Sequence, residues 1–177
     1  MHVIAIDPSL TATGLAYMDL DAGKVIDWAC VRTKKDDRLK ATEDLARRIQ
    51  EVAAGVRDFC NKYPGIVAIE GQTGGSYGLA SPPTIFLLGT GYGACLAAIP
   101  GKPIVIASAT VKARVVGDRG KTTKDAAWQA AQPYFTSFPP EPKTKPAREA
   151  VHDAVVVGVA ALPELNQLSQ IAGSPRP

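Results

Sequence analysis

Three acidic residues stand far apart in the sequence, each beside a strongly apolar segment. Asp7 ends the apolar run 3–6, Glu70 ends a second apolar run at 65–69, and Asp153 opens an apolar stretch near the end of the chain. Two buried strands would each deliver one carboxylate to the same edge of a sheet. A buried cluster of carboxylates is costly unless a cation occupies it, and a divalent metal ion is the natural occupant. The three acids therefore predict a metal site.

Such a cluster is suited to the hydrolysis of a phosphodiester. The reaction needs an activated water, an in-line displacement and relief of charge on the leaving oxygen, and two divalent ions about 3.5–4 Å apart provide all three. Mg²⁺ keeps several waters, so a few carboxylates suffice to hold it. Taken singly, each acid also fits a structural role: a turn residue for Asp7, a solvated strand end for Glu70, and an acid favoured by the helix dipole for Asp153.

A basic stretch lies between the second and third acids. Its five cations fall within thirteen residues and are opposed there only by Asp118; they are Lys112, Arg114, Arg119, Lys121 and Lys124. Such a run commonly coats a solvated helix face, but beside an acidic metal site it predicts contacts to nucleic-acid phosphates. In the Gly-rich loop 71–83, Tyr77 is either a base-stacking side chain or an incidental residue of a linker.

The elements that must position these groups follow from periodicity and turn residues. We expect strands at 2–7, 11–19, 24–33, 66–70 and 103–107, with a hairpin turn at 21–24. We expect helices at 39–63, 84–99, 108–116 with Ser108 as cap, from a cap at Thr122 or Thr123 to about 132, and at 147–162 with Pro146 leading in. The proline-rich residues 133–146 should be irregular. The result is an α/β domain over 1–163, followed by a polar, frayed tail at 164–177.

Four motifs, in this order, resemble those of the RuvC-type Holliday junction resolvases in the RNase H-like nuclease superfamily. They are Ile4-Ala5-Ile6-Asp7-Pro8-Ser9 with Thr13-Gly14, Ala68-Ile69-Glu70, Val111-Lys112-Ala113-Arg114-Val115-Val116-Gly117 with Lys121 and Lys124, and His152-Asp153-Ala154. The resemblance covers residues 3 to about 160. It implies an RNase H-like mixed five-stranded sheet, a meander of three antiparallel strands and then two parallel strands, with helices on both faces.

The same resemblance implies roles for individual residues. Asp7, Glu70 and Asp153 would be metal ligands, and Lys112 and Lys124 would lie near the scissile phosphate. The partner implied is branched DNA, chiefly a four-way junction, cut by a homodimer. The cofactor implied is Mg²⁺ or Mn²⁺, with two ions per site, and the products are 5′-phosphate and 3′-hydroxyl ends.

The chain departs from the family pattern at two places. The family's fourth acidic position, three residues before the last Asp and usually Asp or His, is Ala150 here. On a helix, position −4 lies about 40° from Asp153 in projection and position −1 about 100°, so Glu149 is the predicted substitute ligand and His152 the poorer one. If neither reaches, one ion is held loosely and activity favours Mn²⁺ or is low. The aromatic residue expected soon after Glu70 is also replaced, by Gln72 and Thr73.

Three other functions remain open. A ribonuclease of the same superfamily would act on RNA–DNA hybrids or precursor RNA. A junction-binding module with a degraded site is motivated by Ala150. An actin-like phosphotransferase also ends its first strand in an Asp before a turn, but it leaves Asp153 and the basic stretch unexplained.

Composition narrows the class of protein. The 177 residues, 46% hydrophobic and 21% charged, fit a single soluble domain, and the excess of 20 Lys and Arg over 17 Asp and Glu is mildly basic. Cys30, Cys60 and Cys95 have no metal-ligand spacing and predict free thiols in a reducing compartment. No secretory signal or run of about 20 apolar residues is present, so we expect a cytoplasmic protein.

Two further patterns predict little chemistry. Gly89, Gly91 and Gly93 are not followed by a Lys-Ser/Thr pair and predict close helix packing rather than a nucleotide loop. His2 and His152 are the only histidines, and no nucleophile triad is supported.

Overall fold

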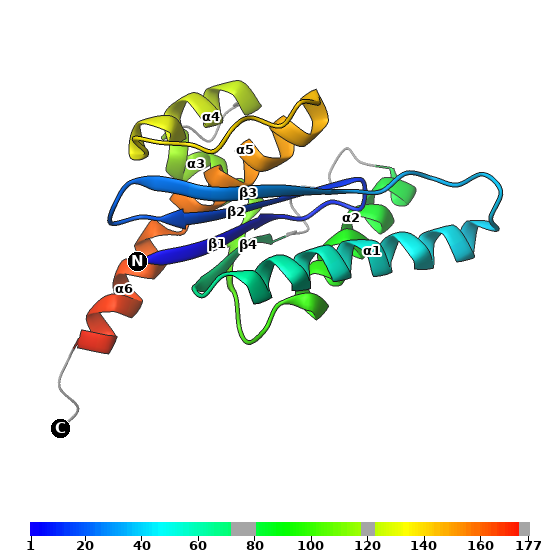
Figure 1. The fold of residues 1–177 in the computed structure, drawn as a ribbon, viewed down its shortest axis with the longest axis horizontal. Helices are drawn as coiled ribbons and strands as arrows, with labels where there is room; N and C mark the ends of the chain where they lie inside the picture. Colours follow the sequence, from blue (N-terminus) through cyan, green and yellow to red (C-terminus); the bar gives the residue numbers. More distant parts are fainter. Residues whose placement is uncertain (72–80, 118–122, 174–177) are drawn as a thin grey trace.

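The computed structural model describes residues 1–71, 81–117 and 123–173. Five strands form one mixed sheet in the order β3-β2-β1-β4-β5 (Figure 1). They are β1 (His2–Asp7), β2 (Ala12–Asp19), β3 (Lys24–Arg32), β4 (Ile66–Gly71) and β5 (Ile104–Ala107). β1, β2 and β3 pair antiparallel, whereas β4 pairs parallel with both β1 and β5. The predicted α/β fold and its sheet topology are confirmed.

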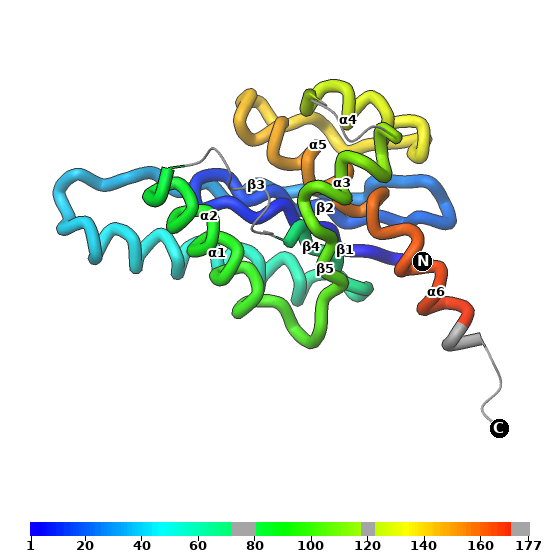
Figure 2. Tube along the Cα trace, turned by 180° about the vertical axis from the view of Figure 1, so that it is seen from behind, coloured from blue at the N-terminus to red at the C-terminus, as the bar shows by residue number. Residues whose placement is uncertain are grey.

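Helices cover both faces of this sheet (Figures 1 and 2). One face carries α1 (Ala41–Lys62) and α2 (Pro82–Ala98). The other carries α3 (Ser108–Val116), α4 (Lys124–Ala131) and α5 (Lys145–Ala160), and α6 (Leu162–Gly173) continues beyond α5. The strands alternate their side chains between the two layers, as the period of two requires.

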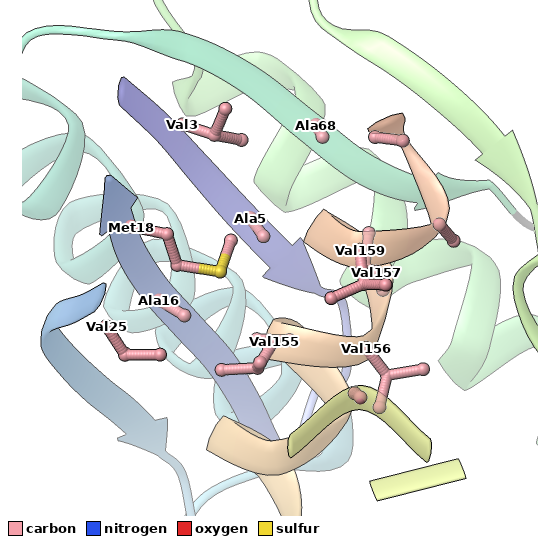
Figure 3. Close-up of a cluster of buried hydrophobic side chains, with 14 of the residues drawn as sticks. Val3, Ala5, Ala16, Met18, Val25, Ala68, Val155, Val156, Val157 and Val159 are labelled. Carbon is pink, nitrogen blue, oxygen red and sulfur yellow. The ribbon is translucent and has the colours of Figure 1, made fainter. Parts of the chain in front are cut away.

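The side chains that face α1 and α2 are large. They are Ile4, Ile6, Leu15, Tyr17 and Ile69, all buried. On the face toward α5, the strands present the small residues Ala5, Ala16 and Ala68 beside Val155 and Val157, together with larger side chains such as Val3 and Met18 (Figure 3). Small side chains let a helix backbone approach a sheet closely, so α5 lies almost on the strands.

Gly14 marks the closest approach of α5 to the sheet. A Cβ atom added at Gly14 would lie 1.8 Å from the backbone oxygen of Ala150. The added Cβ would be bonded to the Gly14 main chain and the oxygen belongs to the Ala150 main chain, so neither atom can move aside by a side-chain rotation. The motif glycine after the first turn is therefore required by the passage of α5 over β2.

Two details differ from the sequence predictions. Ser108 is the first residue of α3, and Ala107 occupies the cap position, because β5 passes into α3 without a loop. The proline-rich region contains a short 3-10 turn at Gln132–Tyr134. Thr123, one of the two predicted caps, does cap α4, and its Oγ1 accepts a hydrogen bond from the Ala126 amide at 3.2 Å.

The tail predicted to be frayed from residue 164 is instead helical to Gly173. Pro163 suggests a break, but proline is tolerated in the first turn of a helix, where its missing amide has no intrahelical partner. Leu165, two residues after Pro163, is fully buried in the core beside α5. Burial of this side chain anchors the start of α6.

All three cysteines carry free thiols, as predicted. Within the described ranges, no helix has both the length and the apolar character that crossing a membrane would require.

Candidate active site

Parallel strands bring the first two acids to one edge of the sheet. β1 and β4 run side by side with Ile6 opposite Ile69, and each strand then delivers its acid, Asp7 or Glu70. The edge opens into a cavity of about 140 Å³. Its lining consists of Asp7, Glu70, Ser108, Val111, Lys112, Lys124, Ala127, Asp153 and Val156. The three acids and two of the lysines predicted from the sequence thus share one pocket.

The third acid comes from α5. Asp153 lies three residues after Ala150, whose backbone rests on Gly14, and Gly14 is the strand partner of Asp7. The same close contact that requires glycine at position 14 therefore sets how near α5, and with it Asp153, comes to the end of β1.

The turn that follows Asp7 is held from several sides. The Ser9 hydroxyl accepts from the Thr11 amide at 3.2 Å, and the Thr13 hydroxyl donates to the Ser9 carbonyl at 2.5 Å. A Cβ atom added at Gly91 of α2 would lie 2.6 Å from the backbone nitrogen of Leu10. α2 is thus seated directly against the backbone of this turn.

A buried polar link joins the same turn to α1. The Thr33 hydroxyl donates to the Leu10 carbonyl at 2.5 Å, and Arg48 Nε donates to the Thr33 oxygen at 2.8 Å. Arg48 also lies 3.9 Å from Asp44, and both side chains are buried. The sequence pattern gave no indication that Thr33 and Arg48 lie close to the turn after Asp7.

The carboxylates repel one another in this setting. Burial, followed by the charges of Glu70 and Asp153, raises the pKa of Asp7 well above its ordinary value. Burial also raises the pKa of Glu70, although a hydrogen bond from Ser108 and the charges of Lys112 and Lys124 oppose that change. A cation placed among these groups would relieve both effects.

Lys124 supplies part of that positive charge. Its ammonium group donates to Asp153 Oδ2. Burial disfavours the charged lysine, but the hydrogen bond and charge of Asp153 prevail and raise its pKa. The lysine and the aspartate therefore form an ion pair at the mouth of the pocket.

The donor set is chemically suited to a divalent cation, since it consists of hard carboxylate oxygens. Among the residues described, no three His, Cys, Asp or Glu side chains stand close enough to form a finished ligand group. Mutual repulsion keeps carboxylates apart unless a cation lies between them, and here Lys124 neutralises one of the three. The chemistry of these donor groups nevertheless fits a divalent cation.

The helix α5 does not bring the predicted fourth ligand to the pocket lining. Glu149 lies 3.6 Å from Lys145 and is 44% exposed, although its charge is felt by Lys124. His152 stacks face to face on Trp128, with ring centroids 3.7 Å apart. Ala150 is buried. Glu149 as a ligand remains a prediction, and the position of His152 agrees with its being the poorer choice.

The predicted basic residues divide into groups. Lys112 and Lys124 line the pocket. Arg114 instead donates to Glu164 at 2.6 Å and to the Ala160 carbonyl at 2.9 Å, so it ties α3 to α5 and α6. Arg119, Lys121 and Tyr77 lie outside the described residues.

Ser108 is a pocket residue that the sequence predictions treated only as a helix cap. Its hydroxyl hydrogen-bonds Glu70. The order of the strands could have predicted the position of Ser108. β5 runs parallel to β4, with Ala107 opposite Gly71, so the residue after Ala107 lies at the same edge of the sheet as Glu70.

No protein-family model matches the chain. A curated relative, the crossover junction endodeoxyribonuclease RuvC of Polaromonas naphthalenivorans (strain CJ2), is 30% identical over 127 residues, which are 70% of this chain and 66% of the relative. The alignment therefore spans just under two thirds of that protein's length.

Two solved structures share the fold. A structure of T. thermophilus RuvC in complex with Holliday junction substrate superposes with a TM-score of 0.67 at 20% identity, covering 96% of this chain and 97% of the other. A Thermus thermophilus RuvC structure gives 0.67 at 18% identity, covering 94% and 96%. A curated relative at 30% identity, the shared fold and three acids around one pocket all agree: the chain is similar in sequence to a RuvC endonuclease and has the RuvC fold.

Proposed function

We propose that this protein is a metal-dependent, structure-selective endonuclease that hydrolyses branched DNA, chiefly four-way junctions, and leaves 5′-phosphate and 3′-hydroxyl ends. The supporting observation is the single pocket lined by Asp7, Glu70 and Asp153 together with Lys112 and Lys124. Sequence similarity to a crossover junction endodeoxyribonuclease RuvC supports the same reaction class.

The three acids hold the metal in this proposal. Divalent ions, Mg²⁺ or Mn²⁺ and two per site as the family resemblance implies, would activate water and relieve charge on the leaving oxygen. The ammonium groups of Lys112 and Lys124, which line the same pocket, would contact the scissile phosphate. Lys124 would exchange its ion pair with Asp153 for that phosphate.

The test is cleavage of a labelled four-way junction with Mg²⁺, with Mn²⁺ and with neither, beside forked, linear and RNA–DNA hybrid duplexes. We expect cutting of the junction only with metal, and little cutting of the linear duplex. Asp153→Asn should abolish cutting and leave junction binding intact, whereas Lys112→Ala should cut more slowly. Wild-type rates in Asp153→Asn would refute the site, and preference for the hybrid would make the protein a ribonuclease.

A second candidate, a junction-binding module with little or no cleavage, is favoured by one observation. Position 150 carries alanine, and neither Glu149 nor His152 lines the pocket. The discriminating experiment is Ala150→Asp, which returns a carboxylate to that position. Tight junction binding without cutting in wild type, together with cutting gained in Ala150→Asp, would establish this second function.

We also propose that the homodimer implied by the family resemblance is joined through α2. α2 has no charged residue, and its side chains Phe86 and Leu87 are 60% and 40% exposed. The outer face of α1 carries Glu51, Arg57 and Asp58. Light scattering should give twice the chain mass, and Phe86→Asp should give a monomer with the same helical content. A monomeric wild type would contradict this assembly.

A further inference from the structure

Besides the packing of alanines, two specific side-chain interactions join α4 to α5, and the proposed function uses only one of them. The first is the ion pair of Lys124 with Asp153. The second is the stack of Trp128 on His152, with ring planes only 2° apart. Lys124 and Trp128 are four residues apart on α4, one helical turn, and the residues they meet are neighbours on α5. Two points so placed fix both the distance and the rotation between the helices.

Trp128 is the principal anchor of α4. The helix has the sequence KDAAWQAA, in which the other apolar residues are alanines, and only Ala127 and Ala131 among them are buried. Alanine faces allow close packing but do not define a rotation about the helix axis. The indole ring, which reaches across to α5, supplies the directional contact.

The surface on which Trp128 rests is itself fixed. The His152 side chain is 13% exposed, with Nε2 lying 3.3 Å from Glu141 Oε1 and the ring lying 5.9 Å from that of Trp28. Trp28 in turn donates its indole N–H to the Pro140 carbonyl at 3.1 Å. Trp128 therefore docks on a half-buried ring that is packed near Trp28 and has one carboxylate, that of Glu141, beside Nε2.

The lysine cannot hold α4 in place by itself. Its side chain is 62% exposed, and an exposed ion pair on a long, flexible side chain contributes little to a fixed geometry. Lys124 also has to release Asp153 to act on a phosphate in the proposed reaction. The stack remains when that ion pair is given up.

From these contacts we propose that Trp128 is a positioning residue: by stacking on His152 it keeps α4 in register with α5 and so holds the Lys124 ammonium group over Asp153. This inference rests on the proposed nuclease function for its kinetic consequence, but the placement of Lys124 is a property of the protein without DNA or metal. It also gives His152 a structural role in the site.

The kinetic test is a double-substitution cycle on the single-turnover cleavage rate at saturating Mg²⁺. Trp128→Ala should lower the rate about ten-fold, with junction affinity unchanged, and Trp128→Phe should restore most of it because a phenyl ring still stacks. Lys124→Ala should lower the rate by roughly 10², and adding Trp128→Ala to it should change nothing further. Losses that multiply in the double variant would show that Trp128 does not act through Lys124.

The matched control is Phe138→Leu, which trims the same aromatic cluster at a ring 5.4 Å from Trp128 and leaves the stack on His152. We expect it to lower the melting temperature about as much as Trp128→Ala while the cleavage rate stays within two-fold of wild type. Equal rate losses in the two variants would make Trp128 an ordinary core residue and overturn the proposal.

A second readout requires no activity. The lysines are reductively ¹³C-methylated, and the NMR signal of Lys124 is assigned by its absence in Lys124→Arg. In metal-free wild type, the chemical shift of this signal should differ from the shifts of the other exposed lysines. It should move to their range in Trp128→Ala and return in Trp128→Phe. A signal unmoved by Trp128→Ala would refute the positioning role, whether or not the protein cuts DNA. A shifted signal in a protein that cuts no substrate would refute only the proposed function.

Discussion

The two faces of the sheet are packed differently where α5 passes over the strands. Toward α1 and α2 the strands present large side chains such as Ile6 and Leu15. Toward α5 they present Ala5, Ala16 and, farther along β2, Met18, and at Gly14 the strand backbone meets the backbone of α5. Large side chains can repack around a change, whereas a backbone contact cannot. The contact at Gly14 therefore limits the position of α5 and of the proposed metal ligand Asp153, whereas α1 and α2 meet the strands through side chains.

The largest effect should come from Gly14→Ala. The new Cβ would meet the Ala150 carbonyl oxygen at 1.8 Å, so α5 must move away from β2 and take Asp153 with it. We expect a loss of more than about 3 kcal/mol in the free energy of unfolding, measured in urea, because overpacking against backbone exceeds the usual range. Cleavage by the folded fraction should be undetectable. A variant with normal cleavage would show that the close contact does not set the site.

Leu15→Ala, one residue along the same strand, is the counterpart on the other face. Leu15 is fully buried among the large side chains, so its truncation should cost about 2–5 kcal/mol of stability. Cleavage per folded molecule should stay within two-fold of wild type. If this variant also lost catalysis when assayed well below its melting temperature, the two faces would not differ as described.

Asp7→Asn should make the metal-free protein more stable at neutral pH. Burial and the charges of Glu70 and Asp153 raise the pKa of Asp7 in the folded state above 3.8, its ordinary value. The folded state then holds a proton that the unfolded state has released, so wild-type stability falls as pH rises from about 3.8 to the folded pKa. The gain in Asp7→Asn should appear over that range and persist above it.

Urea titrations of both proteins at several pH values, with and without Mg²⁺, measure this gain. Added Mg²⁺ should stabilise wild type and narrow its difference from the variant. A variant less stable than wild type at neutral pH without metal would contradict the repulsion among the three acids.

The smallest effect should come from Arg114→Ala. It removes the ion pair with Glu164 and the hydrogen bond to the Ala160 carbonyl, but the pair is one-third exposed, so we expect only about 0.5–1 kcal/mol. Arg114 lowers the pKa of Glu164 below 4.5. The stabilisation is thus present above about pH 4.5 and lost as pH falls through the folded pKa. Lys112→Ala, two residues away, should slow cleavage without this loss of stability.

Sequence reasoning reached the parts of this fold that depend on local pattern. The strand ends at Asp7 and Glu70 follow from apolar runs closed by an acid, and the α1 helix follows from its three- and four-residue spacing. Strand pairing then brings the acids together, since parallel neighbours end at one edge. Asp153, Lys112 and Lys124 stood out by their residue types and neighbours, and the family resemblance then assigned them roles at the same site.

The missed features all depend on contacts distant in sequence. Ser108 reaches Glu70 only because β5 lies beside β4. Arg114 looked like one more phosphate contact, but its partner Glu164 lies in a helix that Pro163 concealed. His152 and Trp128 meet across two helices. None of these pairs of residues is recognisable from a repeating pattern in the sequence.

Gly91 has a consequence for how this protein can diverge. The outward side chains of α2 meet solvent or, in the proposed dimer, another subunit, so they are free to change as long as partner surfaces change with them. Position 91 has no such freedom, since a single added carbon would press on the backbone at Leu10, three residues from Asp7. Substitutions along α2 should therefore accumulate unevenly, with drift on its outer surface and none at the point that touches the turn after Asp7.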